Sequence, residues 1–262
     1  MEKSSITVDN SRAGEIIALA LDVGTGILIS GGEINRAENT IERMCKAMGA
    51  ESTQVFAIPF IVSASVSFAG GVAVSQSRRV SDMSYNLKRV EQLNAVSRHL
   101  CDGRITFEQA RRRTDEILSE KSPLNWKMLL GAALACGGFS VFFGGSVLDG
   151  IFAALIGILI IFLENHRPSF MNQALQTIFS SFVTGILAMT LSILRLPVSY
   201  DNIIIGVIML IIPGLAVGNA IKELLLGNTI SGSLRIIQSL LFTVLIALGF
   251  AASFLLLGGL IK

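Results

Sequence analysis

The second half of this chain has very few charged residues. Residues 124–262 hold six Lys or Arg and four Asp or Glu, whereas residues 1–123 hold fifteen of each. The composition is 52% hydrophobic and the mean hydropathy is +0.66, values that an ordinary soluble enzyme does not have. We therefore expect two domains in two different solvents, a water-facing domain at 1–123 and a transmembrane domain at 124–262.

Several kinds of functional site are also missing from the sequence. The three cysteines, Cys45, Cys101 and Cys136, lie far apart and form no CxxC pair, which argues against a disulfide framework and against a zinc site. No GxxxxGK[ST] loop occurs, which excludes an ATP-driven pump of the P-loop type for this chain. The formal net charge of +2 gives no reason to expect a nucleic-acid partner. We expect no metal and no cofactor.

Long uncharged intervals divide the second half. Four of them contain 20 to 27 residues, enough for a helix that crosses a bilayer, which needs about 20 apolar residues. A fifth interval, Gly150–Leu163, contains only 14 residues and would have to borrow flanking residues to span. We expect an all-α bundle of five transmembrane helices, at about 128–147, 148–164, 174–194, 202–221 and 236–260.

The positions of Lys and Arg in the loops predict the orientation of the chain. A cytoplasmic first domain places four basic residues inside and two, Arg195 and Lys262, outside. The first ten residues, MEKSSITVDN, lack the apolar core of a signal peptide. We expect a multi-pass protein of the cell membrane with a cytoplasmic N-terminus and a C-terminus outside.

The first half has the pattern of an α+β domain. Apolar spacing predicts helices over 12–30, 35–48 and 87–101, and the Thr106-x-x-Gln109 capping box predicts another helix to about residue 120. Residues 54–80 are rich in β-branched residues and are interrupted by Ala69-Gly70-Gly71, which favours a β-hairpin. An alternative makes 55–74 a sixth membrane span, because this stretch has no charge.

Three further motifs have competing interpretations. Asp22–Gly26 resembles the first phosphate loop of sugar and acetate kinases, but that fold needs a second phosphate loop and a longer soluble chain. In the third span, Ser181 and Thr184 share a face with Ser180, which fits either tight packing or a polar solute pathway. In the fourth span, Pro213-Gly214 predicts a kink or a break, either for packing or to present backbone groups to a solute.

Three stretches together resemble the threonine/serine exporter family. The first is Gly31–Ile41, and the second is Leu93-Asn94 with Ile105–Ala110. The third and most specific is Ile212–Leu224, continued by Gly227-Asn228, Gly232 and Arg235. One departure is Lys222-Glu223, where the family often has arginine or another polar residue before an aspartate.

The resemblance implies a gradient-driven secondary exporter, not an enzyme, that moves a small polar metabolite such as threonine, serine or a dicarboxylate like succinate. Fused members have about ten spans, so a five-span chain implies a smaller five-span partner that resembles the C-terminal half, and a higher oligomer is possible. The implied substrate pathway, to which we add Ser181 and Thr184, includes Pro213, Gly214, Asn219, Lys222, Glu223 and Arg235.

Two residues of the first domain are also candidates. Arg36 and Glu38 fit an ion pair or a gate, or a plain salt bridge at a helix start. The alternative function is a membrane-anchored hydrolase or sensor with its activity in residues 1–123. An anchor needs neither five spans nor a Pro-Gly break, which favours the exporter.

Overall fold

A computed structural model describes residues 9–80, 85–120, 124–166, 168 and 171–260. These residues form ten α-helices, a three-stranded sheet and a short 3-10 helix at Gly258–Leu260. The chain divides into two compact units. Unit 1 comprises Met1–Lys121 and Gly218–Arg235, and unit 2 comprises Ser122–Val217 and Ile236–Lys262. Residue 123, the expected domain boundary, lies outside the described residues.

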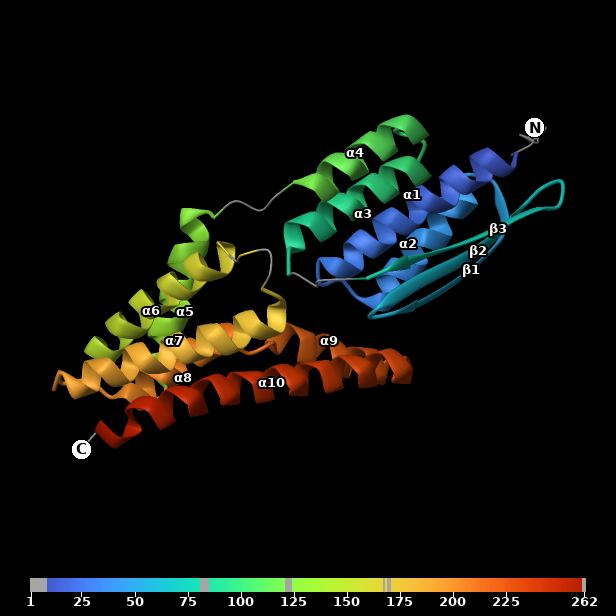
Figure 1. The fold of residues 1–262 in the computed structure, drawn as a ribbon. Coiled ribbons are helices and arrows are strands. Elements are labelled where there is room, and N and C mark those ends of the chain that lie inside the picture. The colour runs from blue at the N-terminus through green and yellow to red at the C-terminus, as the bar shows by residue number, and fades with distance from the viewer. Residues whose placement is uncertain (1–8, 81–84, 121–123, 167, 169–170, 261–262) are drawn as a thin grey trace. The chain divides into compact units, whose positions relative to one another are not determined.

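Unit 1 is built in three layers. Helices α1 and α2 lie between the sheet on one side and α3 and α4 on the other (Figure 1). The sheet is antiparallel with the order β1-β2-β3. The elements are α1 (Asn10–Ile29), α2 (Ile34–Ala47), β1 (Ala50–Ile58), β2 (Ile61–Phe68), β3 (Val72–Arg79), α3 (Leu87–Cys101) and α4 (Phe107–Ser119).

The middle layer explains why most of the α1 surface is apolar. Ile17, Leu21 and Leu28 are completely buried, and α1 contacts β3 on one side and α3 and α4 on the other. A helix that is hydrophobic all round is expected to be buried all round. The helices predicted from apolar spacing and from the Thr106–Gln109 capping box all form, within a residue or two of the expected ends.

The sheet has one buried face and one exposed face. Val62, Ala64, Val66 and Phe68 of β2 point into the core, and the residues between them face outward. On the outer face, Ser63 and Ser65 form hydroxyl hydrogen bonds of 2.6 and 2.8 Å with serines of β3. Strict alternation of this kind is typical of a half-buried strand. The alternative of a sixth membrane span at 55–74 is therefore wrong.

The predicted hairpin turn is present, and a second turn precedes it. Gly70 and Gly71 connect β2 to β3 with φ of +85° and +81°, a left-handed region that favours glycine. A second, two-residue turn at Pro59-Phe60 divides the first predicted strand into β1 and β2. Pro59 cannot donate a ladder hydrogen bond, which fits its place in the turn.

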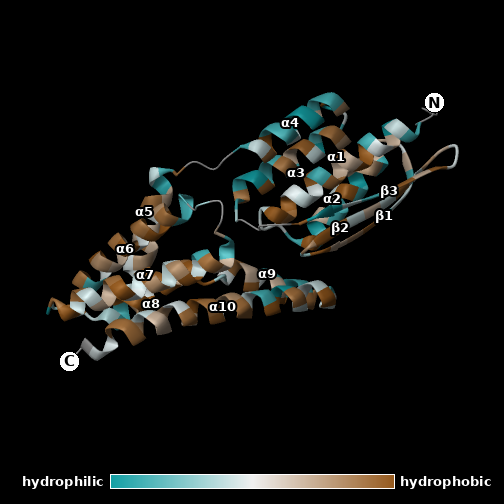
Figure 2. Cartoon of the chain, viewed as in Figure 1, coloured by the Kyte–Doolittle hydropathy of each residue, from teal (hydrophilic) through white to brown (hydrophobic). Residues whose placement is uncertain are grey.

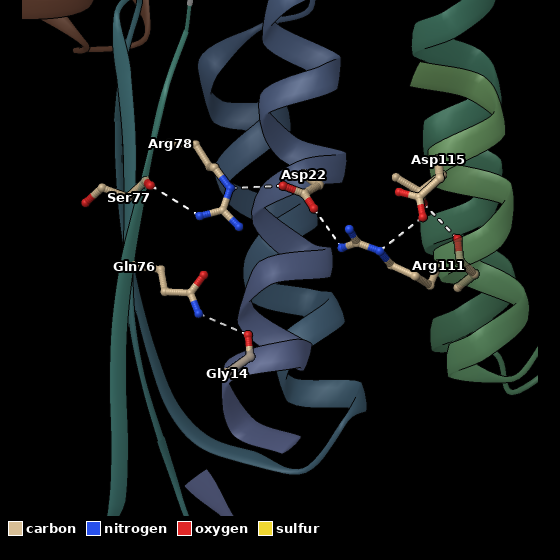
Figure 3. A network of polar contacts seen from close by, with 9 residues as sticks. Gly14, Asp22, Gln76, Ser77, Arg78, Arg111 and Asp115 are labelled. Atoms are coloured by element: carbon tan, nitrogen blue, oxygen red, sulfur yellow. Dashed lines mark hydrogen bonds and ion pairs between the residues drawn. The ribbon is translucent and has the colours of Figure 1, made fainter. Parts of the chain in front are cut away.

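An ionic network connects the three layers (Figure 3). Asp22 of α1 accepts hydrogen bonds from Arg78 of β3 at 3.0 Å and from Arg111 of α4 at 2.7 Å. Arg111 also pairs with Asp115 on its own helix at 3.2 Å. Asp22–Gly26 lies in the middle of α1 rather than in a loop, so its backbone amides bond within the helix and cannot cradle a phosphate.

Unit 2 is entirely helical among the described residues. Its helices are α5 (Trp126–Phe142), α6 (Val147–Asn165), α7 (Gln173–Ile193) and α8 (Tyr200–Ile211). Two more helices, α9 (Gly214–Leu225) and α10 (Thr229–Leu257), belong partly to unit 1 and partly to unit 2. Apolar residues cover most of these helices (Figure 2).

Three described helices, α6, α7 and α10, are long and apolar enough to cross a membrane. The pair α8 and α9, bent by 52°, makes a fourth if it counts as one span, and α5 is apolar but has only 17 residues. The break falls at Pro213-Gly214, as predicted. Helix α6 reaches 19 residues because it extends beyond Gly150–Leu163 at both ends, and Asp149 closes a capping box with Ser146. The five-span bundle remains a prediction.

Candidate functional site

The turn between α1 and α2 requires glycine. Gly31 has φ of +88°, and a Cβ at this position would lie 2.5 Å from the ring of Tyr85. At Gly32, a Cβ would lie 2.8 Å from the carbonyl oxygen of Ile27. The two glycines therefore allow a tight turn whose carbonyl groups can accept hydrogen bonds from another segment.

Side chains of the second part of unit 1, residues 218–235, bind these carbonyl groups. The side-chain amide of Asn219 donates to the carbonyl of Gly31 at 3.2 Å. The guanidinium of Arg235 donates to the carbonyl of Gly32, also at 3.2 Å. The residues that make these bonds are thus 188 and 203 positions away in the sequence.

A buried ion pair lies next to these bonds. Glu223 Oε1 is 3.3 Å from Arg235 Nε, and their side chains are only 2% and 1% exposed. Glu223 Oε1 also accepts a 3.4 Å hydrogen bond from the backbone N–H of Ile34, the first residue of α2. Because Glu33, the N-cap of α2, makes no side-chain capping bond, Glu223 takes over that role. A carboxylate is favoured there by the orphan N–H groups and the helix dipole.

Glu33 is bound elsewhere. Its carboxylate pairs with Lys222 Nζ at 2.9 Å and lies 4.0 Å from Arg36. Lys222 and Arg36 are exposed and Glu33 is partly exposed, and ion pairs at the surface contribute little to stability. We call this set of contacts the turn junction, formed by Gly31, Gly32, Glu33, Ile34, Asn219, Lys222, Glu223 and Arg235.

The turn junction holds complementary charges, and two of its charged side chains, Glu223 and Arg235, are almost completely buried. Two groups can bind an anion: the Arg235 guanidinium and the Ile34 N–H at the start of α2. Two kinds of group can bind a cation: the Glu223 carboxylate and the carbonyls of Gly31 and Gly32. Glu223 Oε2 is buried and accepts no hydrogen bond from the described residues. Such a buried acceptor is costly unless it is used.

The other predicted pathway residues lie in unit 2. Pro213 and Gly214 mark the break between α8 and α9. Ser181 and Thr184 are buried on α7. Their hydroxyl groups donate to backbone carbonyls of the same helix, those of Thr177 at 2.9 Å and Ser180 at 2.8 Å. Both hydroxyl groups thus donate within α7, which fits a role in helix packing.

Arg36 and Glu38 do not pair with each other in the structure. Arg36 reaches Glu33, whereas Glu38 Oε1 accepts a 2.8 Å hydrogen bond from the backbone N–H of Ala57 on β1. Residues two apart on a helix point in different directions. Burial raises the pKa of Glu38 above its ordinary value of 4.5, and the bond from Ala57 opposes this shift. Glu38 therefore fastens α2 to an edge strand.

Comparison with known families shows the family to which the chain belongs. Residues 18–257 match the model of a family described as "Putative threonine/serine exporter". The chain belongs to this family. No curated protein and no solved structure matches the chain. The matched range of this exporter-family member includes every residue of the turn junction.

Sequence reasoning missed part of the junction in this exporter-family protein. Gly31 and Gly32 belonged to the resembling stretch, but nothing in the sequence pointed to contacts with Asn219 and Arg235. The only signal for Glu33 in the sequence was its place as an acidic residue before a predicted helix. In the described part of the chain, no group of three or more His, Cys, Asp or Glu residues could hold a metal ion.

Proposed function

We propose that this protein is a subunit of a secondary exporter in the cell membrane and is not an enzyme. Family membership and the apolar helices support transport across a membrane. The observation that carries the proposal is the buried Glu223–Arg235 pair at the turn junction. A fully buried pair contributes little net stability against its desolvation cost, so its presence favours a role in binding.

The substrate that fits best is a small zwitterion such as threonine or serine. Its carboxylate would replace Glu223 as the partner of Arg235 and of the Ile34 N–H. Its ammonium group would replace Arg235 as the partner of Glu223 and of the Gly32 carbonyl. The internal ion pair thus resembles the charge pattern of an amino acid backbone.

A dicarboxylate such as succinate is the second candidate, because Arg235 and Lys222 are both cationic. Its two carboxylates would have one buried cation and one exposed cation to bind. The nearby carboxylates of Glu223 and Glu33 would oppose it, which makes it the weaker candidate.

Substrate binding would separate Glu223 from Arg235 and so loosen the turn junction. An ion or proton gradient would drive the cycle. In the proposed orientation, the N-terminus lies in the cytoplasm and the C-terminus lies outside. The proposed complex also contains a smaller five-span membrane protein and forms a higher oligomer if several pairs assemble. Asn219 would hold the Gly31 carbonyl during the change, and the Pro213-Gly214 break would act as the hinge.

The test is a gene deletion with complementation. Cells that lack the gene and are fed a threonine-containing dipeptide should accumulate threonine, and the intact gene should restore efflux. If succinate rather than threonine accumulates, the dicarboxylate is the substrate. Unchanged efflux of a broad set of metabolites would contradict the exporter. Ester or phosphate hydrolysis by the purified full chain, lost in Arg36 or Glu38 variants, would support a membrane-anchored hydrolase instead.

A further inference from the structure

Three exposed apolar side chains surround the turn between β1 and β2. Phe56 is 57% exposed, Phe60 is 46% exposed and Ile61 is 39% exposed. Exposed apolar residues are common when they occur singly, but a group with two phenyl rings on one tight turn marks an interaction surface. We call Phe56, Phe60 and Ile61 the apolar turn.

A hydrogen bond joins the apolar turn to the first turns of α10. The hydroxyl of Ser231 donates to the carbonyl of Ala57, a residue that directly follows Phe56, at 3.4 Å. Both residues belong to unit 1. The depth of Ser231 relative to a bilayer therefore determines the depth of the apolar turn.

The length of α10 indicates that depth. Its 29 residues extend for about 44 Å, whereas the hydrocarbon core of a bilayer is about 30 Å thick. The uncharged part, from Ile236 to Leu257, extends for about 33 Å and can fill the core alone. Residues 229–235, which include Arg235, then lie in the headgroup region. Ser231 and the apolar turn lie there with them.

The neighbouring side chains fit the same environment. Leu225, Leu226 and Ile230, at the connection between α9 and α10, are 82%, 56% and 66% exposed. Arg79 is exposed and lies directly opposite Ile61 in the sheet, where its guanidinium can reach lipid phosphates. Apolar side chains beside a cation are typical of surfaces that rest in a membrane interface.

We propose that the apolar turn inserts into the lipid headgroup region of the bilayer and anchors unit 1 to the membrane surface. The insertion depends on the membrane helix α10 and not on the transported solute, so it goes beyond the proposed function. The partner is the lipid itself rather than a second protein chain.

Tryptophan fluorescence in the full chain tests this proposal. Trp126 is the single tryptophan, so Trp126→Phe gives a silent background. The Phe60→Trp variant is then reconstituted in vesicles with or without phospholipids brominated on their acyl chains. The matched control is Ser65→Trp, on the exposed face of the same strand β2 but away from the turn. Phe56→Trp provides a second probe of the apolar turn.

Insertion predicts a blue-shifted emission and about a twofold loss of fluorescence in brominated vesicles for Phe60→Trp and Phe56→Trp. Ser65→Trp should lose little fluorescence to brominated lipid and should be quenched by acrylamide from the water phase. Equal quenching of Phe60→Trp and Ser65→Trp by brominated lipid would overturn the proposal. It would also be overturned if Phe60→Trp were shielded from acrylamide yet not quenched by brominated lipid, because a protein then covers the turn.

Discussion

At the scale of single residues, the most informative side chain is Glu223. It caps α2 from a position 189 residues away and neutralises Arg235 in the same place. The family resemblance in the sequence implied Lys222, Glu223 and Arg235 as pathway residues. It could not identify their partners, because Gly31, Gly32 and Ile34 contribute backbone groups, which any residue type can present.

The buried pair predicts a specific result in a double-mutant cycle. Arg235→Met should lower the free energy of unfolding by about 3–5 kcal/mol, because it leaves the Glu223 carboxylate buried without its cation. Glu223→Gln in the Arg235→Met background should recover part of that loss, since the remaining buried charge is removed. Thermal unfolding of the detergent-solubilised protein measures both. A double variant that is less stable than Arg235→Met would contradict the pairing.

Glu38 predicts a pH effect on stability. Its pKa is raised in the folded state, so the folded protein favours the protonated carboxyl. The resulting stabilisation is complete below the ordinary value of 4.5 and is lost as the pH rises through the raised pKa. The amide oxygen of Glu38→Gln still accepts from Ala57 N–H but carries no charge.

The stability of the wild type should therefore fall relative to that of Glu38→Gln as the pH is raised from 4 to 7.5. Glu38→Ala loses the acceptor and should be less stable than Glu38→Gln at every pH. Unfolding midpoints across this range provide the measurement. A constant difference between the wild type and Glu38→Gln would show that the burial of Glu38 does not shift its titration.

At the scale of elements, the spacing of hydrophobic residues predicted the positions of helices better than it separated strands from a membrane span. The spacing at Leu93 and Val96 and the capping box at Thr106 fixed α3 and α4 closely, because both signals are local. The same reasoning left strands and a membrane span as alternatives for 55–74. A serine-lined strand with a buried apolar face contains as few charges as a span, so only the alternation of burial separates the two.

Helix packing in unit 2 depends on glycines that touch neighbouring backbone. A Cβ on Gly206 of α8 would lie 2.5 Å from the carbonyl oxygen of Cys136 on α5, whereas a Cβ on Gly131 would meet nothing within 4 Å. Gly206→Ala should lower the unfolding midpoint, with a cost of about 1–3 kcal/mol from overpacking. Gly131→Ala, the matched control on α5, should leave it nearly unchanged. Equal midpoints for the two variants would contradict the close approach of α8 to α5.

At the scale of the whole molecule, the charge contrast between 1–123 and 124–262 predicts two environments, and the structure divides into two compact units. The charge contrast could not show that residues 218–235 form part of unit 1, because this segment lies between two predicted spans and far along the chain from 1–123. Nor could it fix the number of spans, since α5 is short and α8 and α9 are bent. The long sequence separation of the junction contacts is the reason that the site became visible only in the fold.

The most direct test of the account is threonine efflux from cells that carry single variants of the buried pair. Glu223→Gln and Arg235→Gln should each reduce the efflux rate about tenfold or more, since each removes a charged partner worth about 1.5–3 kcal/mol. Lys222→Gln, a neighbouring exposed charge, should reduce it much less. Equal amounts of each variant in the membrane are the required control. Efflux at the wild-type rate in both Glu223→Gln and Arg235→Gln would contradict a role for the buried pair in transport.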